Sequence, residues 1–172
     1  MILGLDMATK KTGYCVMSKS GDLKAFGVLR TDELDIRKRI KQLYIKIKDL
    51  IINNNIKHIV FEDVPITNHN NLKTGKDLCI LQGAILSLCF ENDVNFTFYA
   101  PSSWRSKIGL YDGTRLGMKR EIQKNKAIEK VNNMFDLNLV YYANETKTHQ
   151  TDDDKAEAIC LVLAYLKDCS ER

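Results

Sequence analysis

Four acidic residues at separated points of the chain are the first candidates for chemistry. Asp6 ends the apolar run MILGLD, and Glu62 ends a second run, IKHIVFE. Asp154 and Glu157 open the late amphipathic segment DDDKAEAICLVLAYL. Burying several ionised carboxylates close together costs free energy unless their pKa values rise or cations bind them. Clustered carboxylates that hold divalent metal ions hydrolyse phosphodiester bonds in many nucleases, and this set predicts the same chemistry.

The elements that must position these acids are predicted by hydrophobic periodicity. Strands are expected at 1–6, 13–18, 24–30, 57–62 and 95–100, and helices at 31–53, 77–91, 118–134 and 153–168. The first three strands form an antiparallel meander with a turn at 19–22. Loops are expected at 63–76 and 102–117, and 136–151 is irregular or contains a short strand.

This order predicts an α/β fold, with a mixed five-stranded sheet that joins the antiparallel meander to parallel strands and is flanked by helices. The first strand is expected to pair with the strand that follows the first helix. Asp6 and Glu62 then lie side by side at the carboxyl ends of those strands, where ligands bind in open α/β sheets.

The late helix supplies the other two acids. Asp154 and Glu157 are three residues apart and share one helix face. Asp153 is four residues before Glu157 and is the alternative third ligand. Any one of these acids alone is more often structural or solvated, but the combination favours a metal site.

Composition narrows the class of protein. The 172 residues are 44% hydrophobic and 28% charged, with two prolines and nine glycines, and predict one domain over residues 1–172 without a long linker. No apolar run reaches the length of a membrane span, and the start of the chain does not resemble a signal peptide. Five cysteines without CxxC spacing are typical of reduced thiols in a cytoplasmic protein.

A basic segment at 101–130 is the candidate polyanion-binding surface. It holds eight Lys and Arg against three acids, although the net charge of the chain is only +4. A solvated helix face explains such an excess equally well. Trp104 and Arg105 are a candidate pair for base stacking and phosphate clamping, although a lone Trp is more often a core residue. The other candidate DNA contacts are Lys107, Tyr111, Arg115, Lys119 and Arg120.

Several segments together resemble the RuvC family of Holliday-junction resolvases, within the RNase H-like superfamily. The similar segments are ILGLDMATKKTGYCV, IVFEDVP, LQGAILSL, FYAPSSWR and DDDKAEAICLVLA, in order along nearly the whole chain. The opening motif alone is weak, because actin-like ATPases and sugar kinases begin similarly. The acidic strand end and the acidic last helix make the set specific.

The resemblance implies an RNase H-like fold and paired phosphodiester hydrolysis in four-way DNA with two Mg²⁺ ions per site, for which Mn²⁺ substitutes. It implies that Asp6 bridges both ions, that Glu62 binds one, and that Asp154 and Glu157 bind the other. His149 is a candidate for proton transfer and is equally well explained as an ordinary loop residue.

The chain also departs from the family pattern. Glu157 stands where the family usually has Asp, and the run Asp152-Asp153-Asp154 leaves the register of the third ligand open. The loop 63–76 does not have the usual sequence of the region that contacts the junction, so selectivity and coupling to a branch-migration motor are not predicted.

A homodimer is the expected assembly, because a four-way junction has two strands to cut and a two-fold dimer presents two sites. The helix 77–91 is the candidate contact, with Gly83-Ala84 permitting close approach beside Leu81, Ile85 and Leu88. These residues are alternatively core residues under their own sheet.

Three other functions remain alternatives. The first is a related nuclease that acts on RNA or on other branched replication intermediates. The second is an actin-like nucleotide-binding module, which needs a second phosphate loop and a second similar domain. The third is a DNA-binding protein without catalysis, which does not explain four retained acids.

Overall fold

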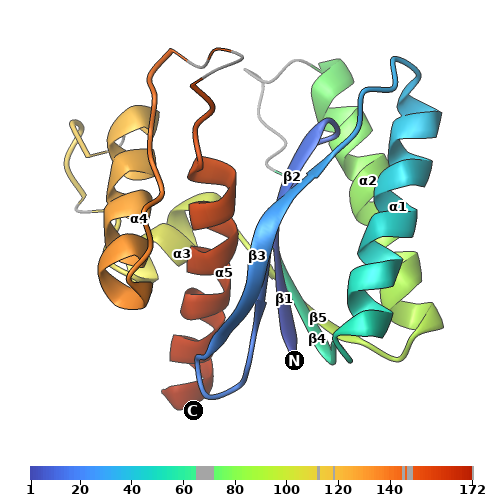
Figure 1. Ribbon diagram of the computed structural model, residues 1–172, viewed down its shortest axis with the longest axis horizontal. Helices are drawn as coiled ribbons and strands as arrows, with labels where there is room; N and C mark the ends of the chain where they lie inside the picture. Colours follow the sequence, from blue (N-terminus) through green and yellow to red (C-terminus); the bar gives the residue numbers. More distant parts are fainter. Residues whose placement is uncertain (65–71, 112, 118, 145, 147–148, 172) are drawn as a thin grey trace.

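The computed structural model describes residues 1–64, 72–111, 113–117, 119–144, 146 and 149–171, and these contain a five-stranded mixed sheet (Figure 1). The strands are β1 (Ile2–Asp6), β2 (Lys11–Met17), β3 (Leu23–Arg30), β4 (His58–Glu62) and β5 (Asn95–Tyr99). Their spatial order is β3-β2-β1-β4-β5, with β1–β2 and β2–β3 antiparallel and β1–β4 and β4–β5 parallel. The mixed sheet and the meander predicted from the sequence are thereby confirmed.

Helices cover both faces of this sheet, which gives three layers (Figure 1). The helices are α1 (Ile36–Asn53), α2 (Leu72–Glu91), α3 (Pro101–Lys107), α4 (Arg120–Phe135) and α5 (Asp153–Ser170). One core lies between the sheet and the pair α1 and α2, and includes Leu3, Leu5 and Phe61. The other lies under α3, α4 and α5, and includes Ile2 and Val60. None of the helices in the described part of the chain combines the length and the apolar character needed to span a bilayer.

The alternation of side chains along a strand decides which way the strand-end acids point. Ile2 and Val60 belong to the core beneath α5, and side chains two and four residues further along a strand point to the same face. Asp6 and Glu62 therefore point to the α5 face. Because β1 and β4 are parallel neighbours, with Leu5 opposite Phe61, these two acids meet at one edge of the sheet.

Two glycines allow α5 to lie directly on the sheet. A Cβ atom on Gly4 would lie 2.3 Å from the carbonyl oxygen of Ala158, and one on Gly13 would lie 2.0 Å from that of Asp154. Both distances are far below van der Waals contact, so any larger residue would force the helix away. Gly13 is also the strand partner of Asp6, which means that the first turn of α5 rests beside Asp6.

Two segments differ from the sequence predictions. The region 102–117 was expected to be a loop, but α3 occupies Pro101–Lys107, with proline at the first helical turn, where its missing N–H costs nothing. The helix expected at 77–91 begins at Leu72. The expected loop 63–76 is therefore partly helical, and its residues 65–71 lie outside the described residues. No strand is found within the described residues of 136–151, which are irregular.

Candidate active site

The carboxylates of β1, β4 and α5 act on one another electrostatically. The pKa of Asp6 is raised well above its ordinary value. Burial is the main cause, and three neighbouring carboxylates add to it: Glu157, Asp154 and Glu62. The structure therefore brings together the four acids that the sequence singled out. Burial also raises the pKa of Glu62, although Arg105 and Trp104 act in the opposite direction.

Basic side chains hold the acids around Asp6. The Arg105 guanidinium joins Glu62, at 3.0 Å, to Glu157, at 2.6 Å. The Lys11 ammonium lies 2.7 Å from Asp154 Oδ2. Asp6 itself makes no side-chain hydrogen bond or ion pair with any part of the chain that the structure describes. The site is thus a set of paired carboxylates around one unpaired carboxyl group.

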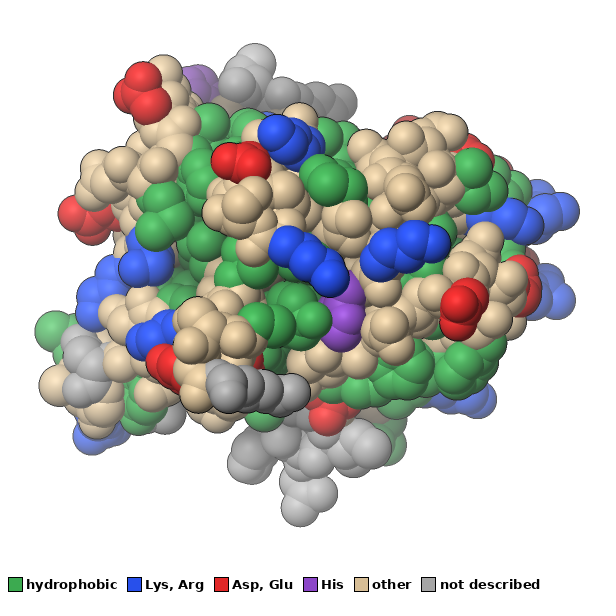
Figure 2. Space-filling model, turned by 90° about the horizontal axis from the view of Figure 1, so that it is seen from below, with side chains coloured by type: hydrophobic (Ala, Val, Ile, Leu, Met, Phe, Trp, Pro, Cys, Tyr) green, Lys and Arg blue, Asp and Glu red, His purple; other side chains and the backbone are tan. Residues whose placement is uncertain are grey.

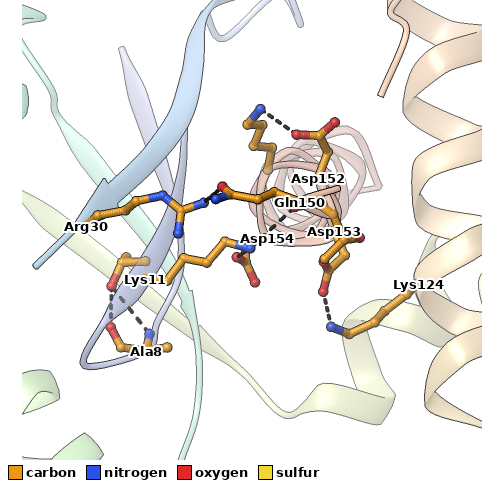
Figure 3. A network of polar contacts seen from close by, with 11 residues as sticks. Ala8, Lys11, Arg30, Lys124, Gln150, Asp152, Asp153 and Asp154 are labelled. Atoms are coloured by element: carbon orange, nitrogen blue, oxygen red, sulfur yellow. Dashed lines mark hydrogen bonds and ion pairs between the residues drawn. The ribbon is translucent and has the colours of Figure 1, made fainter. Parts of the chain in front are cut away.

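The start of α5 presents three consecutive aspartates, namely the N-cap residue and the first two helical residues, each directed to a different lysine (Figure 3). Asp152 pairs with Lys155, Asp153 with Lys124 from α4, and Asp154 with Lys11 from β2. Asp154 adds to the raised pKa of Asp6. Asp153 is 1% exposed and points toward α4. The two candidates for the third ligand, Asp153 and Asp154, therefore point in different directions.

The donor set suits a hard divalent cation, because every candidate ligand is a carboxylate oxygen. Asp153 Oδ1 and Asp154 Oδ2 are buried and accept no hydrogen bond, even though Lys11 lies close to the latter. Within the described ranges, no three acidic, His or Cys side chains converge tightly enough to enclose one ion as they stand. Ion pairs with Arg105, Lys11 and Lys124 hold the carboxylates apart from one another.

The prediction that Trp104 stacks on a DNA base is wrong. Its ring is 1% exposed, so it offers no surface for stacking on a base, and the alternative of a core residue is confirmed. The indole N–H donates a 2.7 Å hydrogen bond to Glu62 Oε1. Arg105, expected to clamp phosphate, instead lies over the Trp104 ring and faces Glu62 and Glu157.

The other predicted DNA contacts divide into two groups. Lys107 pairs with Asp168, about four helical turns along α5 from Asp154, and so lies away from the acids. Arg115, Lys119 and Arg120 are exposed. A hollow of about 390 Å³ beside the site is lined in part by Arg120, Lys124, Tyr141, Tyr142 and Thr151.

His149 lies in the segment before α5, with its ring edge-on to Tyr142 at a centroid distance of 5.1 Å. Tyr111 is partly buried in the segment after α3, where its backbone N–H donates to the Arg105 carbonyl. The roles suggested for these two residues in proton transfer and phosphate contact remain predictions.

Sequence reasoning missed Lys11 as a partner of the acids and gave Lys124 no role in the site. Lys11 begins the strand that pairs with β1, five residues after Asp6, and this short hairpin was the available signal. Lys124 had no such signal, because its approach to Asp153 depends on how α4 packs against α5.

These features together define an acid-lined site of the RNase H-like class, with two strand-end carboxylates facing the first turn of a helix. The chain belongs to the RuvC family: the family model described as crossover junction endodeoxyribonuclease RuvC matches residues 2–160.

Relatives and solved structures agree with this membership. A RuvC from Orientia tsutsugamushi (strain Ikeda) is 30% identical over 112 residues, covering 63% of this chain and 69% of the relative. A RuvC from Baumannia cicadellinicola is 22% identical over 176 residues, covering 100% and 91%. Thermus thermophilus RuvC, solved with a Holliday junction substrate, has a TM-score of 0.71 at 13% identity, covering 99% of this chain and 94% of that one. Fowlpox virus resolvase, solved with Holliday junction DNA, has a TM-score of 0.61 at 14% identity, covering 98% and 97%. The predicted RNase H-like fold is confirmed.

The raised pKa of Asp6 leads to a prediction for the metal-free protein. A buried acid with a raised pKa destabilises the fold at high pH, and this cost disappears as the pH falls through that pKa toward the ordinary value of about 4. Asp6→Asn should therefore melt at a higher temperature than the wild type in chelator at pH 8, and the gain should shrink toward pH 4.

The matched control is Asp22→Asn, in the exposed β2–β3 turn. Hydrogen bonds from Ser20 and Ser18 lower the pKa of Asp22, so its loss should give no gain at any pH. Melting curves that show no pH-dependent gain for Asp6→Asn would argue against the carboxylate crowding.

Proposed function

We propose that this chain is a metal-dependent endonuclease that resolves Holliday junctions by paired phosphodiester hydrolysis. The proposal rests on the proximity of four acids, because the charges of Glu157, Asp154 and Glu62 add to the effect of burial in raising the pKa of Asp6. Membership of the RuvC family supports it, as do relatives named crossover junction endodeoxyribonucleases and similar folds solved with Holliday junction DNA.

The proposed cofactor is Mg²⁺, two ions per site, with Mn²⁺ as a substitute. When bound, these ions would lower the pKa of an attacking water molecule and offset the charge that develops on the leaving 3′ oxygen. The residues that would hold the ions are Asp6, Glu62, Asp154 and Glu157. Asp154 lies against Gly13, the strand partner of Asp6, whereas Asp153 points to Lys124 on α4, and this geometry supports Asp154 over Asp153 as the third ligand.

Other residues of the chain keep these carboxylates in place. The Trp104 indole orients Glu62 by its hydrogen bond, and the ring closes the site from the protein side. Gly13 permits α5 to bring Asp154 to the partner strand of Asp6. Lys124 pairs with Asp153 and also lines the basic hollow, so the acidic site and the proposed DNA surface are continuous.

The proposed DNA surface is the exposed basic part of the segment before α4 and at its start. Replacing Arg115, Lys119 and Arg120 together with Gln should weaken binding to four-way, forked and duplex DNA alike. The slope of log K against log salt should become shallower, by about 0.9 for each phosphate that the protein no longer neutralises. Binding titrations at several salt concentrations measure this slope.

The control is a triple substitution at the other end of the sheet. Lys19, Lys24 and Lys57 lie near the amino end of β1, because Ile2 pairs with both Met17 and His58. Figure 2 views this end, where basic, acidic and hydrophobic side chains are interspersed. Equal changes of slope in the two triple variants would contradict a specific basic surface.

We also propose a two-fold homodimer through the outward face of α2. Leu81, Ile85 and Leu88, expected to flank the contact, are fully buried against their own sheet and α1, so that part of the prediction is wrong. Gly83 is exposed, and a Cβ atom there would meet nothing within 4 Å. Ile80 and Phe90, which are 47% and 72% exposed, lie on the same side. Exposed apolar residues around a glycine suit a second copy of the same helix.

Ile80→Glu with Phe90→Glu should convert the dimer to monomers, because paired carboxylates would be buried at a two-fold contact. Sedimentation at micromolar concentration measures the state, and junction cleavage should change from paired cuts to single nicks. Met134→Glu on α4, where the side chain is 54% exposed, should leave the dimer intact. A wild-type monomer that still makes paired symmetric cuts would contradict the dimer.

Substrate preference tests the function itself. Four-way junctions, flaps, linear duplexes and RNA–DNA hybrids of matched sequence should be compared in Mg²⁺ under single-turnover conditions. The proposal predicts that the junction is cut fastest. Faster cleavage of the hybrid or flap would favour the alternative of a nuclease for RNA or other replication intermediates.

A further inference from the structure

Arg105 connects an acid at the end of β4 with an acid in the first turns of α5. Its Nη1 lies 3.0 Å from Glu62 Oε1 on β4, and its Nη2 lies 2.6 Å from Glu157 Oε1 on α5. The guanidinium also lies 4.2 Å from the centre of the Trp104 ring, and that indole donates to the same Glu62 oxygen. Two consecutive residues of α3 thus fix Glu62 together.

This bridge is buried and has a clear electrostatic purpose. The Arg105 side chain is 14% exposed and that of Glu157 is 9% exposed, so water screens their attraction little. A guanidinium presents a planar fork of donors that can satisfy two carboxylates at once. Without a cation between them, Glu62 and Glu157 would repel each other, and both raise the pKa of Asp6.

The position of the bridge also bears on metal binding. The oxygens that Arg105 holds belong to two of the four proposed ligands, and the carboxylates are spread around the basic groups rather than converged on one point. A second cation that draws Glu62 and Glu157 inward must compete with the guanidinium for the same two groups. Arg105 and a metal ion are then alternative counter-charges.

We propose that Arg105 is a positioning residue that holds Glu62 and Glu157 in the metal-free protein and gives up at least one of them when divalent metal binds. The inference rests on the proposed function, in which these acids are metal ligands. It predicts that Arg105 stabilises the empty site and lowers its affinity for metal. A purely structural arginine would stabilise the protein equally with and without metal.

The test is Mn²⁺ binding without DNA, measured by calorimetry, together with melting temperature in chelator and in saturating Mn²⁺. Arg105→Gln should melt below the wild type in chelator and bind Mn²⁺ about tenfold more tightly, a size typical of coupling between two sites. Saturating Mn²⁺ should restore most of the lost melting temperature. Arg105→Lys keeps one charge without the fork and should fall between wild type and Arg105→Gln, which also covers a failure of Arg105→Gln to fold.

The matched control is Arg37→Gln. Arg37 also pairs with a carboxylate, Asp35, at 2.7 Å, but it is exposed and contacts none of the four acids. It should leave Mn²⁺ affinity unchanged. Unchanged or weaker Mn²⁺ affinity in the Arg105 variants, with the same loss of melting temperature in chelator and in Mn²⁺, would overturn the inference.

A Mn²⁺ titration of Asp6→Asn distinguishes a failure of this inference from a failure of the proposed metal site. If Asp6→Asn removes Mn²⁺ binding but the Arg105 variants bind as the wild type does, the inference fails and the metal site stands. If Asp6→Asn binds Mn²⁺ as the wild type does, the metal site itself is wrong.

Discussion

Single substitutions Asp6→Asn, Glu62→Gln, Asp154→Asn and Glu157→Gln should each lower the rate of junction cleavage by about a thousandfold or more, because each removes a proposed ligand of the catalytic metal. Binding of the junction should stay within about threefold of wild type, since affinity comes from phosphate contacts with basic residues. Single-turnover cleavage in Mg²⁺ and gel-shift titration in Ca²⁺ measure the two quantities. Ca²⁺ should permit binding without efficient cleavage, because its longer and more flexible coordination misplaces the reacting groups.

Asp153→Asn is the control within the same run of aspartates. Asp153 points away to Lys124 on α4, whereas Asp154 pairs with Lys11 on the strand beside Asp6, so loss of the Asp153 carboxylate should leave most of the cleavage activity. An inactive Asp153→Asn together with an active Asp154→Asn would move the third ligand by one residue. Cleavage at a near wild-type rate by the Asp6 or Glu62 variant would contradict the site.

Gly13→Ala should have the second-largest effect, although it adds only one methyl group. The new Cβ atom would lie 2.0 Å from the carbonyl oxygen of Asp154, and backbone at that position cannot yield as a flexible side chain can. Overpacking of about 1–3 kcal/mol should lower the melting temperature by about 5–10 °C. Displacement of Asp154 by about 1 Å should slow cleavage by about a hundredfold.

Gly75→Ala in α2 is the matched control. A Cβ atom there would meet nothing within 4 Å, and alanine favours helix over glycine by about 1 kcal/mol, so melting temperature should be equal or higher. A Gly13→Ala protein that melts and cuts as the wild type does would show that α5 does not need this close approach.

The periodicity of hydrophobic residues predicted the strands and helices that bury one face against the core. The alternating strands, the turn at 19–22 and the helices α1, α4 and α5 all follow from it, and strand order placed Asp6 beside Glu62. The start of α2 was missed because Leu72, Lys73 and Thr74 are all exposed and leave no apolar repeat. The short helix α3 was missed because glycines follow it closely, although Pro101 at its first turn was a usable signal.

The acids of the site could be predicted, but the groups that hold them could not. An acid at the end of an apolar strand is visible in sequence because it interrupts a pattern. Arg105 looked like a phosphate contact because it lies in a basic segment, and only the packing of α3 beside β4 and α5 turns it toward Glu62 and Glu157. The hydrogen bond from the Trp104 indole to Glu62 could not be predicted either, because it also depends on how α3 packs beside β4.

The most direct measurement is cleavage of a synthetic four-way junction with a fixed branch point, with the cuts mapped on all four strands. We expect cuts that require Mg²⁺ or Mn²⁺, at symmetric positions on two opposing strands, and none with Asp6→Asn. Robust cleavage in excess chelator, or metal-dependent cuts that ignore the branch point, would contradict it.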